Sequence, residues 1–206
     1  PEKKVAMAVD EWGIWVDNEP GTAPGFLFQQ NTMRSALCAV LMLHLFHRYA
    51  DRIRIANLAQ TINVLQAIIL TKDDNMVLTP TYHVFDLLKG HQGGRSLPLA
   101  WDEAPDTIQK GLPQVDLSAS IKEDRITLSL VNLSTEQNAD LSLALQGAAP
   151  SSASGRLLSG RPTDHNSFEE PNRVAVRELE NLSLRDKKLC LSLPPCAIAS
   201  VDVHLA

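Results

Sequence analysis

The sequence has few cysteines and no long apolar run. Its three cysteines, Cys38, Cys190 and Cys196, are an odd number without the paired spacing of zinc ligands. They therefore indicate neither a disulfide framework nor a structural metal site, and a Cys190–Cys196 disulfide across a Pro-Pro turn is the alternative. The longest apolar stretch, residues 37–46, contains His44 and is too short to span a bilayer.

Positive charge is also scarce. The formal net charge is -5, and no cluster of lysine and arginine occurs along the chain. Both features argue against a nucleic acid or an anionic membrane as partner. The chain has 206 residues, of which 44% are apolar and 21% are charged. This composition is typical of a globular protein with room for one or two domains.

The first residues, PEKKVAMAVD, contain no initiator methionine and no apolar targeting core. A strand pattern begins within a few residues of this start. We therefore expect the chain to be a piece of a longer protein. Its compartment stays unknown from this segment, with the cytoplasm slightly favoured.

Residues 1–96 alternate strand and helix patterns. Val5–Val9 is a short continuous apolar run, typical of a strand buried on both faces of a parallel sheet. Residues 53–58 are a second strand candidate. Between them Asn31 can cap a helix whose apolar residues recur every three or four positions, and residues 81–89 predict another helix. This order predicts parallel strands with right-handed crossovers, an α/β arrangement. Two strands cannot close a barrel, so we expect the others outside this chain.

From about residue 115 the apolar period changes to two, as in half-buried strands. Short strands separated by turn formers predict an antiparallel, jelly-roll-like β-sandwich over residues 114–206. Residues 97–113 carry three prolines and little periodicity, so they are interpreted as a linker. The small-residue stretch 147–155 is interpreted as a turn. The predicted strands are 117–121, 126–131, 141–145, 182–184, 189–193 and 198–205.

Polar side chains follow both strands of the first half. Asp10 and Glu11 come directly after the first strand, and Gln60 follows the second. In barrels of β/α units, reactive groups lie at the carboxyl ends of strands, where a carboxylate can attack a sugar's anomeric carbon or act as an acid or base. Trp12 and Trp15 could wall such a pocket, because indole faces suit sugar rings. The alternative is a solvated acidic turn beside two core tryptophans.

Four segments are similar to the C-terminal part of the catalytic barrel of glycoside hydrolase family 51 α-L-arabinofuranosidases. They read VDEWGIWVD, FQQNTMRSALCAVLMLHLF, ADRIRIANLAQTINVLQAIILT and TPTYHVFDLLKGHQ. The segments SLVNLS, DHNSFEEPNRV and LSLPPCAIASVDV resemble the β-sandwich domain that follows this barrel. The resemblance runs in order over nearly the whole chain. It implies the last two β/α units of a (β/α)8 barrel followed by the sandwich.

The resemblance implies a retaining, exo-acting glycosidase that needs no metal or cofactor. Its substrates would be terminal non-reducing α-L-arabinofuranosyl groups of arabinoxylan, arabinan or oligosaccharides. The family's nucleophile falls on Glu11, and its sugar-contacting residues fall on Trp15 and Gln60. Asp10 and Trp12 match the same motif and are interpreted as support for the reacting groups. A homo-oligomer is expected by resemblance alone.

The family's acid/base glutamate, in a GNE-type segment, has no match in this chain. Glu19 follows Asn18 but lies in the loop after Glu11, so it is not assigned that role. We therefore expect the chain alone to be inactive and the longer protein to be active. Asn57 and Asn63 are polar neighbours of the second strand end, with a weaker claim to contact the sugar.

Other interpretations remain open. The sandwich could be a non-catalytic carbohydrate-binding or assembly module attached to a remnant barrel segment, although Phe168 is its only aromatic residue. A related retaining glycosidase with another sugar preference is a further possibility. His44 and His47, three apart on a helix, could share a metal, but the prediction is that one packs and the other is solvated. His83 follows a loop at the site end, and capping or packing is predicted for it, with contact to the sugar as the alternative.

Overall fold

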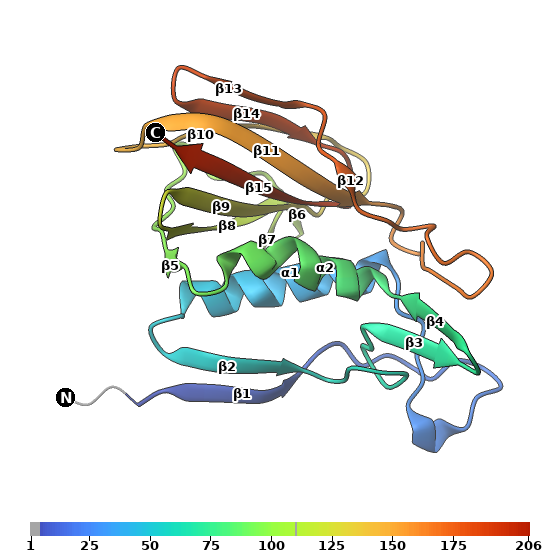
Figure 1. Cartoon of the computed structure of the whole chain (residues 1–206). Helices are drawn as coiled ribbons and strands as arrows, with labels where there is room; N and C mark the ends of the chain where they lie inside the picture. The colour runs from blue at the N-terminus through green and yellow to red at the C-terminus, as the bar shows by residue number, and fades with distance from the viewer. Residues whose placement is uncertain (1–4, 110) are drawn as a thin grey trace.

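The computed structural model describes residues 5–109 and 111–206, so predictions for residues 1–4 and 110 lie outside the described part. The chain is arranged in layers (Figure 1). A three-stranded sheet covers one face of a six-stranded sheet, two helices cover its other face, and a two-stranded parallel sheet lies beneath the helices. The predicted β-sandwich is confirmed, because every pairing within its two sheets is antiparallel.

The first half contains the expected order of strand, helix, strand and helix. These elements are β1 (Met7–Trp12), α1 (Met33–Arg48), β2 (Ile53–Leu58) and α2 (Pro80–Leu88). β1 and β2 are parallel, as predicted, and Trp12 pairs with Leu58. Short 3-10 turns, η1 (Pro24–Phe26) and η2 (Lys89–His91), lie before α1 and after α2.

The expectation that the first strand is buried on both faces is wrong for the described chain. Val5 is 63% exposed and Met7 is 50% exposed. Only one side of β1 and β2 packs against the helices, through residues such as Val9 and Ala56. The strand also runs through Asp10 and Glu11 instead of ending before them.

The start of α1 is held partly by a loop of the sandwich. Thr32, not Asn31, is the N-cap residue, and its backbone N–H donates to the Ser35 hydroxyl. The amides of Met33 and Arg34 donate to the carbonyls of Asp164 and Pro162 at 2.8 and 3.0 Å. Because the first amides of a helix have no partner within it, these carbonyls stabilise its start. The sandwich loop that follows residue 159 therefore reaches the end of the molecule where β1 and β2 end.

A hairpin spans the residues around Asp73. It consists of β3 (Ile69–Lys72) and β4 (Asn75–Leu78), and Asp73 adopts a left-handed φ of 52° in the turn between them. Aspartate tolerates this conformation better than most residues. Beneath the hairpin lies a small core that includes Phe28 and the sandwich residue Phe168.

The sandwich strands largely follow the predicted periods. Within the predicted linker, β6 (Thr107–Gln109) and β7 (Leu112–Pro113) form a short hairpin. The three-stranded sheet has the order β10-β14-β13, and the six-stranded sheet has the order β12-β11-β15-β9-β8-β5. Their bounds are β5 Arg95–Ser96, β8 Val115–Lys122, β9 Arg125–Asn132, β10 Ala139–Ala144, β11 Pro150–Ser159, β12 Arg177–Glu178, β13 Leu182–Arg185, β14 Lys188–Leu193 and β15 Ala197–Leu205.

The prediction of a turn over residues 147–155 is wrong. Most of this stretch belongs to β11, which lies between β12 and β15. Its serines, alanine and glycine are weak strand formers, so composition alone favoured a turn. The small residues have a packing reason: a Cβ on Gly155 would lie 2.9 Å from a methyl of Leu179.

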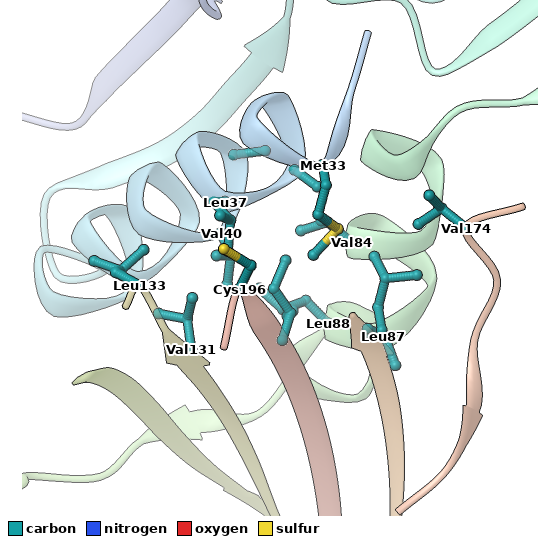
Figure 2. Packing of buried hydrophobic residues seen from close by; sticks show 14 of the residues in the cluster. Met33, Leu37, Val40, Val84, Leu87, Leu88, Val131, Leu133, Val174 and Cys196 are labelled. Carbon is teal, nitrogen blue, oxygen red and sulfur yellow. The ribbon is translucent and has the colours of Figure 1, made fainter. Parts of the chain in front are cut away.

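The six-stranded sheet is buried on both faces. Leu130 and Ala199 face the three-stranded sheet, whereas their neighbours Val131 and Ile198 join the core between the six-stranded sheet and the helices. Figure 2 shows this second core, where Val40 of α1 and Leu87 and Leu88 of α2 gather with Val131 and Cys196. All three cysteines are free, so the alternative of a Cys190–Cys196 disulfide is not observed.

Part of the contact between helices and sheet is polar. Three histidines of α1 and η2 meet serines on β8 and β9, in a cluster called here the histidine seam. Its hydrogen-bond distances are His44 Nε2–Ser129 Oγ 2.8 Å, His47 Nδ1–Ser118 Oγ 3.0 Å, His91 Nδ1–Ser120 Oγ 2.8 Å and His91 Nε2–Ser129 Oγ 2.9 Å. The small polar residues of the predicted alternation are thus buried against helices instead of facing water.

Burial controls the charge of this seam. Because burial disfavours the protonated ring, the pKa of His47 falls to about 4 and that of His91 to about 3. Burial also lowers the pKa of His44, opposed by its hydrogen bond to Asp116 on β8, which Arg48 also binds. The prediction that one of His44 and His47 packs is confirmed by the fully buried His44. The prediction that the other is solvated is wrong, because His47 bonds to Ser118 and burial lowers its pKa. The described residues contain no group of three potential metal ligands, and none of their helices is long and apolar enough to cross a membrane.

Candidate active site

The structure brings Glu11 and Gln60 to the same edge of the parallel strand pair. Glu11 is the penultimate residue of β1, and Gln60 lies two residues beyond β2. The Ala59 N–H donates to the Trp12 carbonyl at 2.8 Å, so the two segments remain side by side where β1 and β2 end. Both side chains are exposed, and the peptide between Ala59 and Gln60 is cis. This is the strand edge at which barrels of β/α units carry reactive groups.

The two tryptophans of the motif differ in their surroundings. Trp12 is only 7% exposed and lies in the core, edge-on to Phe46 with ring centroids 5.4 Å apart and stacked on Phe85 at 6.2 Å. Trp15 is 68% exposed on the loop that follows β1. Trp15 can therefore meet a ligand directly, whereas Trp12 supports β1 from the helix side. Asp10, predicted as support, is exposed on β1.

Buried amide side chains hold the loop that carries Trp15. The Gln29 carboxamide accepts from the Val16 N–H at 3.0 Å and donates to the Ile14 carbonyl at 3.2 Å. The Gln66 carboxamide accepts from the Ile14 N–H at 2.8 Å. Both glutamines are almost fully buried. Residues on each side of Trp15 are thereby fixed, which orders the backbone of an otherwise exposed loop.

Sequence reasoning missed Gln29 and Gln66, although a signal was present. Gln66 interrupts the otherwise apolar run of residues 64–70, and a lone amide in such a run must be hydrogen-bonded if it is buried. The sequence does not say what its partners are, since these lie in the loops after β1 and β2 and in the helices α1 and α2. Asn166 of the sandwich loop is buried too, and its carboxamide donates to the carbonyls of Leu78 and Val174.

Other polar residues near the site have structural partners. The Asn63 carboxamide bonds to Thr71 through both its oxygen and its nitrogen, which ties it to the hairpin. The Glu19 carboxylate accepts from the Gln30 N–H at 3.0 Å, in keeping with its exclusion as an acid/base group. Asn57 is exposed on β2. His83 on α2 is half-buried, and burial lowers its pKa.

A carboxylate and a carboxamide at the carboxyl ends of adjacent parallel strands occupy the edge at which enzymes built from β/α units carry their active sites. The chain belongs to the family described as the α-L-arabinofuranosidase C-terminal domain, whose model matches residues 10–197. The predicted membership of the arabinofuranosidases is thereby confirmed.

Individual relatives agree with this membership. The chain is 39% identical over 207 residues to the intracellular exo-α-L-arabinofuranosidase of Bacteroides ovatus, covering 98% of this chain and 40% of that protein. The crystal structure of the family 51 arabinofuranosidase from Xanthomonas axonopodis pv. citri is 38% identical, with a TM-score of 0.92 over 97% of this chain and 41% of that one. The Thermotoga maritima α-L-arabinofuranosidase in complex with arabinose, 24% identical with a TM-score of 0.84 over 97% of this chain and 43% of that one, shares the fold.

The chain thus spans about two fifths of the length of the relatives it matches. What this chain contributes to the activity of a whole arabinofuranosidase is therefore a matter of proposal.

Proposed function

We propose that the chain is part of a retaining, exo-acting α-L-arabinofuranosidase and supplies its nucleophile, Glu11. The substrates would be terminal non-reducing α-L-arabinofuranosyl groups of arabinoxylan, arabinan or oligosaccharides. One observation carries the proposal: in a chain of this family, Glu11 and Gln60 lie exposed at the carboxyl ends of adjacent parallel strands. Gln60 would hydrogen-bond a ring hydroxyl, and Trp15 would cover the sugar's C–H face.

The architecture that accompanies this proposal is a barrel segment followed by an accessory domain. Residues 1–96 would be the last two β/α units of a (β/α)8 barrel, residues 97–113 the linker and residues 114–206 a jelly-roll-like sandwich. Support comes from the parallel pairing of β1 and β2 and from the exposure of Met7 and Ile55 on this pair. Further parallel strands, from segments outside this chain, would cover these side chains.

The reaction would take two steps, each driven by carboxyl groups. First, a Glu11 carboxylate oxygen bonds to C1 of the arabinofuranosyl ring while the glycosidic C–O bond breaks, and a second carboxyl group protonates the leaving oxygen. That second group, then a carboxylate, removes a proton from water, whose oxygen displaces Glu11 from C1. The two carboxyl groups must lie about 5–5.5 Å apart. We assign the second group to a segment outside this chain, and no metal or cofactor is needed.

The setting of the enzyme is part of the same proposal. Names of relatives such as those from Bacteroides ovatus and Streptomyces lividans include the word intracellular, which favours action inside the cell on imported oligosaccharides. A homo-oligomer is proposed by family resemblance. The alternative, a carbohydrate-binding sandwich, lacks support from the aromatic residues, since Phe168 packs beneath the β3–β4 hairpin instead of offering a flat platform.

Replacing the proposed nucleophile in the complete protein tests the proposal. Glu11→Gln should lower kcat/KM on p-nitrophenyl α-L-arabinofuranoside by about 10⁴-fold or more, because the covalent step is lost. Asp17→Asn, which removes an exposed carboxylate from the loop after Glu11, is the matched control and should retain turnover. The 206-residue chain alone should release no arabinose. Full activity of the Glu11→Gln variant would contradict the proposal.

A further inference from the structure

The turn after β1 and the helices α1 and α2 of the proposed barrel segment meet at one buried side chain. Gln66 is fully buried and belongs to none of these elements. Its Oε1 accepts from the Ile14 N–H at 2.8 Å, just after β1. Its Nε2 donates to the Ser35 carbonyl at 2.8 Å in the first turn of α1, and to the Thr81 hydroxyl at 3.4 Å in the first turn of α2.

The backbone of Gln66 adds the second strand to this set. Its N–H donates to the Ala59 carbonyl at 3.1 Å, and the Ala59 N–H in turn donates to the Trp12 carbonyl at 2.8 Å. The residue thus contacts the chain immediately after Glu11 and Trp12 and immediately before Gln60. Its carboxamide uses its oxygen and its nitrogen, which leaves it one favoured orientation.

The packing around this amide is close. Gly13 has a φ of +152°, and a Cβ added to it would lie 3.2 Å from Gln66 Oε1 and 3.3 Å from the Ala59 carbonyl oxygen. Only a glycine lets the turn after β1 approach the Gln66 carboxamide this closely. The two strand ends are therefore held together by short, directional contacts, and not by loop packing alone.

We infer that Gln66 is a positioning residue that fixes the Glu11 strand end relative to the Gln60 strand end. The inference rests on the proposed function, in which Glu11 attacks a sugar that Gln60 holds. An error of about 1 Å in such a geometry can cost 10²-fold in rate. Gln66 would act through the backbone of its neighbours and touch no substrate.

The test compares two buried glutamines in the complete protein. Gln66→Met removes every hydrogen bond that the Gln66 side chain makes. Gln114→Met is the matched control, because Gln114 is also buried but bonds to Asn132 and Asn138 within the sandwich. At a temperature where both variants are folded by circular dichroism, we expect Gln66→Met to lower kcat/KM about 10²-fold, mainly through kcat. Gln114→Met should leave both constants close to their original values.

A second variant gives a readout that a purely structural role would not move. Gln66→Glu keeps an acceptor for the Ile14 N–H, but an ionised carboxylate cannot donate to the Ser35 carbonyl. Protonation restores that donor, and burial raises the pKa of the introduced carboxyl. Its kcat/KM relative to the unmodified protein should therefore rise as pH falls from 8 to 5. A flat ratio overturns the positioning role even if Gln66→Met fails to fold.

The outcomes separate this inference from the proposed function. If Glu11→Gln has lost turnover while Gln66→Met and Gln114→Met behave alike, the positioning role is overturned and the nucleophile assignment stands. If Glu11→Gln keeps full turnover, the proposed function is overturned and the inference falls with it. A kcat loss specific to Gln66→Met, together with the pH-dependent recovery of Gln66→Glu, supports both.

Discussion

Two pairs of strands in this molecule have opposite surroundings. β9 and β15 lie inside the six-stranded sheet, where Leu130 and Ile198 are fully buried on opposite faces. β1 and β2 form a sheet of two strands in the described chain, and Ile55 is 54% exposed on it. The sandwich buries its own side chains, whereas the β1–β2 pair is packed on one side only. The proposed nucleophile, Glu11, lies on the pair that leaves a face open.

The largest expected difference between the two strand pairs is the cost of a cavity in the buried pair, β9 and β15. In the 206-residue chain, Ile198→Ala should lower the free energy of unfolding by about 2–5 kcal/mol, because it removes fully buried methyl groups. Ile55→Ala, the matched change on the β1–β2 pair, should lower the free energy of unfolding by no more than about 1 kcal/mol. Urea denaturation followed by circular dichroism measures both.

The same pair of variants sharpens the comparison in the complete protein. If further strands cover β1 and β2, Ile55→Ala should become markedly more costly there than in the 206-residue chain. Equal costs of Ile198→Ala and Ile55→Ala in the 206-residue chain would show that the two strand pairs do not differ as described.

A smaller effect is expected at the turn after β1. Gly13→Ala should cost about 1–3 kcal/mol, since it forces an unfavourable φ and crowds Gln66 and Ala59. Gly21→Ala is the control: its φ is +83°, but a Cβ there would meet nothing within 4 Å. Only Gly13→Ala should also reduce kcat in the complete protein. Identical losses of stability and activity for the two variants would contradict the claim that close packing around Gly13 matters for the site.

These expectations mark how much of the fold the sequence could predict. Ile53–Leu58 was predicted as a strand with its observed bounds. The segments that alternate apolar and small polar residues predicted most sandwich strands, because a period of two matches a strand with two different faces. β11 was missed because serine, alanine and glycine carry no strand preference of their own. The small size that β11 needs at Gly155 depends on a partner, Leu179, distant in sequence.

The candidate site was predictable only in part. Glu11, Trp15 and Gln60 stand out because polar or aromatic residues follow strand patterns, and the structure brings the first and last to one edge. Their support was not predictable, since the partners of Gln66 lie up to 52 residues away along the chain. The histidine seam was hidden too, because serines that alternate with leucines suggest a solvated strand face.

The last expected effect concerns pH and the histidine seam. Because the pKa values of His47 and His91 are lowered to about 4 and about 3, the folded chain binds fewer protons than the unfolded chain, whose histidines titrate near pH 6.5. Stability is therefore fully present above about pH 6.5 and falls as the pH drops toward 4, by at most about 1.4 kcal/mol per pH unit for each histidine.

Replacing the seam histidines tests this linkage. The His47→Gln/His91→Gln variant should be less stable than the unmodified chain at pH 7.5, because it loses packing. The difference in stability should shrink as the pH falls to 5. The unmodified chain loses stability over this range because its two buried histidines stay uncharged, whereas the variant has no histidine at these positions. Urea midpoints measured across this range decide the matter, and a difference that stays constant with pH would contradict the assignment of neutral histidines.

The nucleophile itself can be identified directly. The complete protein would be treated with a mechanism-based fluorinated arabinofuranoside that forms a slowly hydrolysed glycosyl-enzyme, digested, and its peptides sequenced by mass spectrometry. We predict the label on the Glu11 side chain, in the peptide that contains DEWGIW. A label on any other residue would contradict the central assignment.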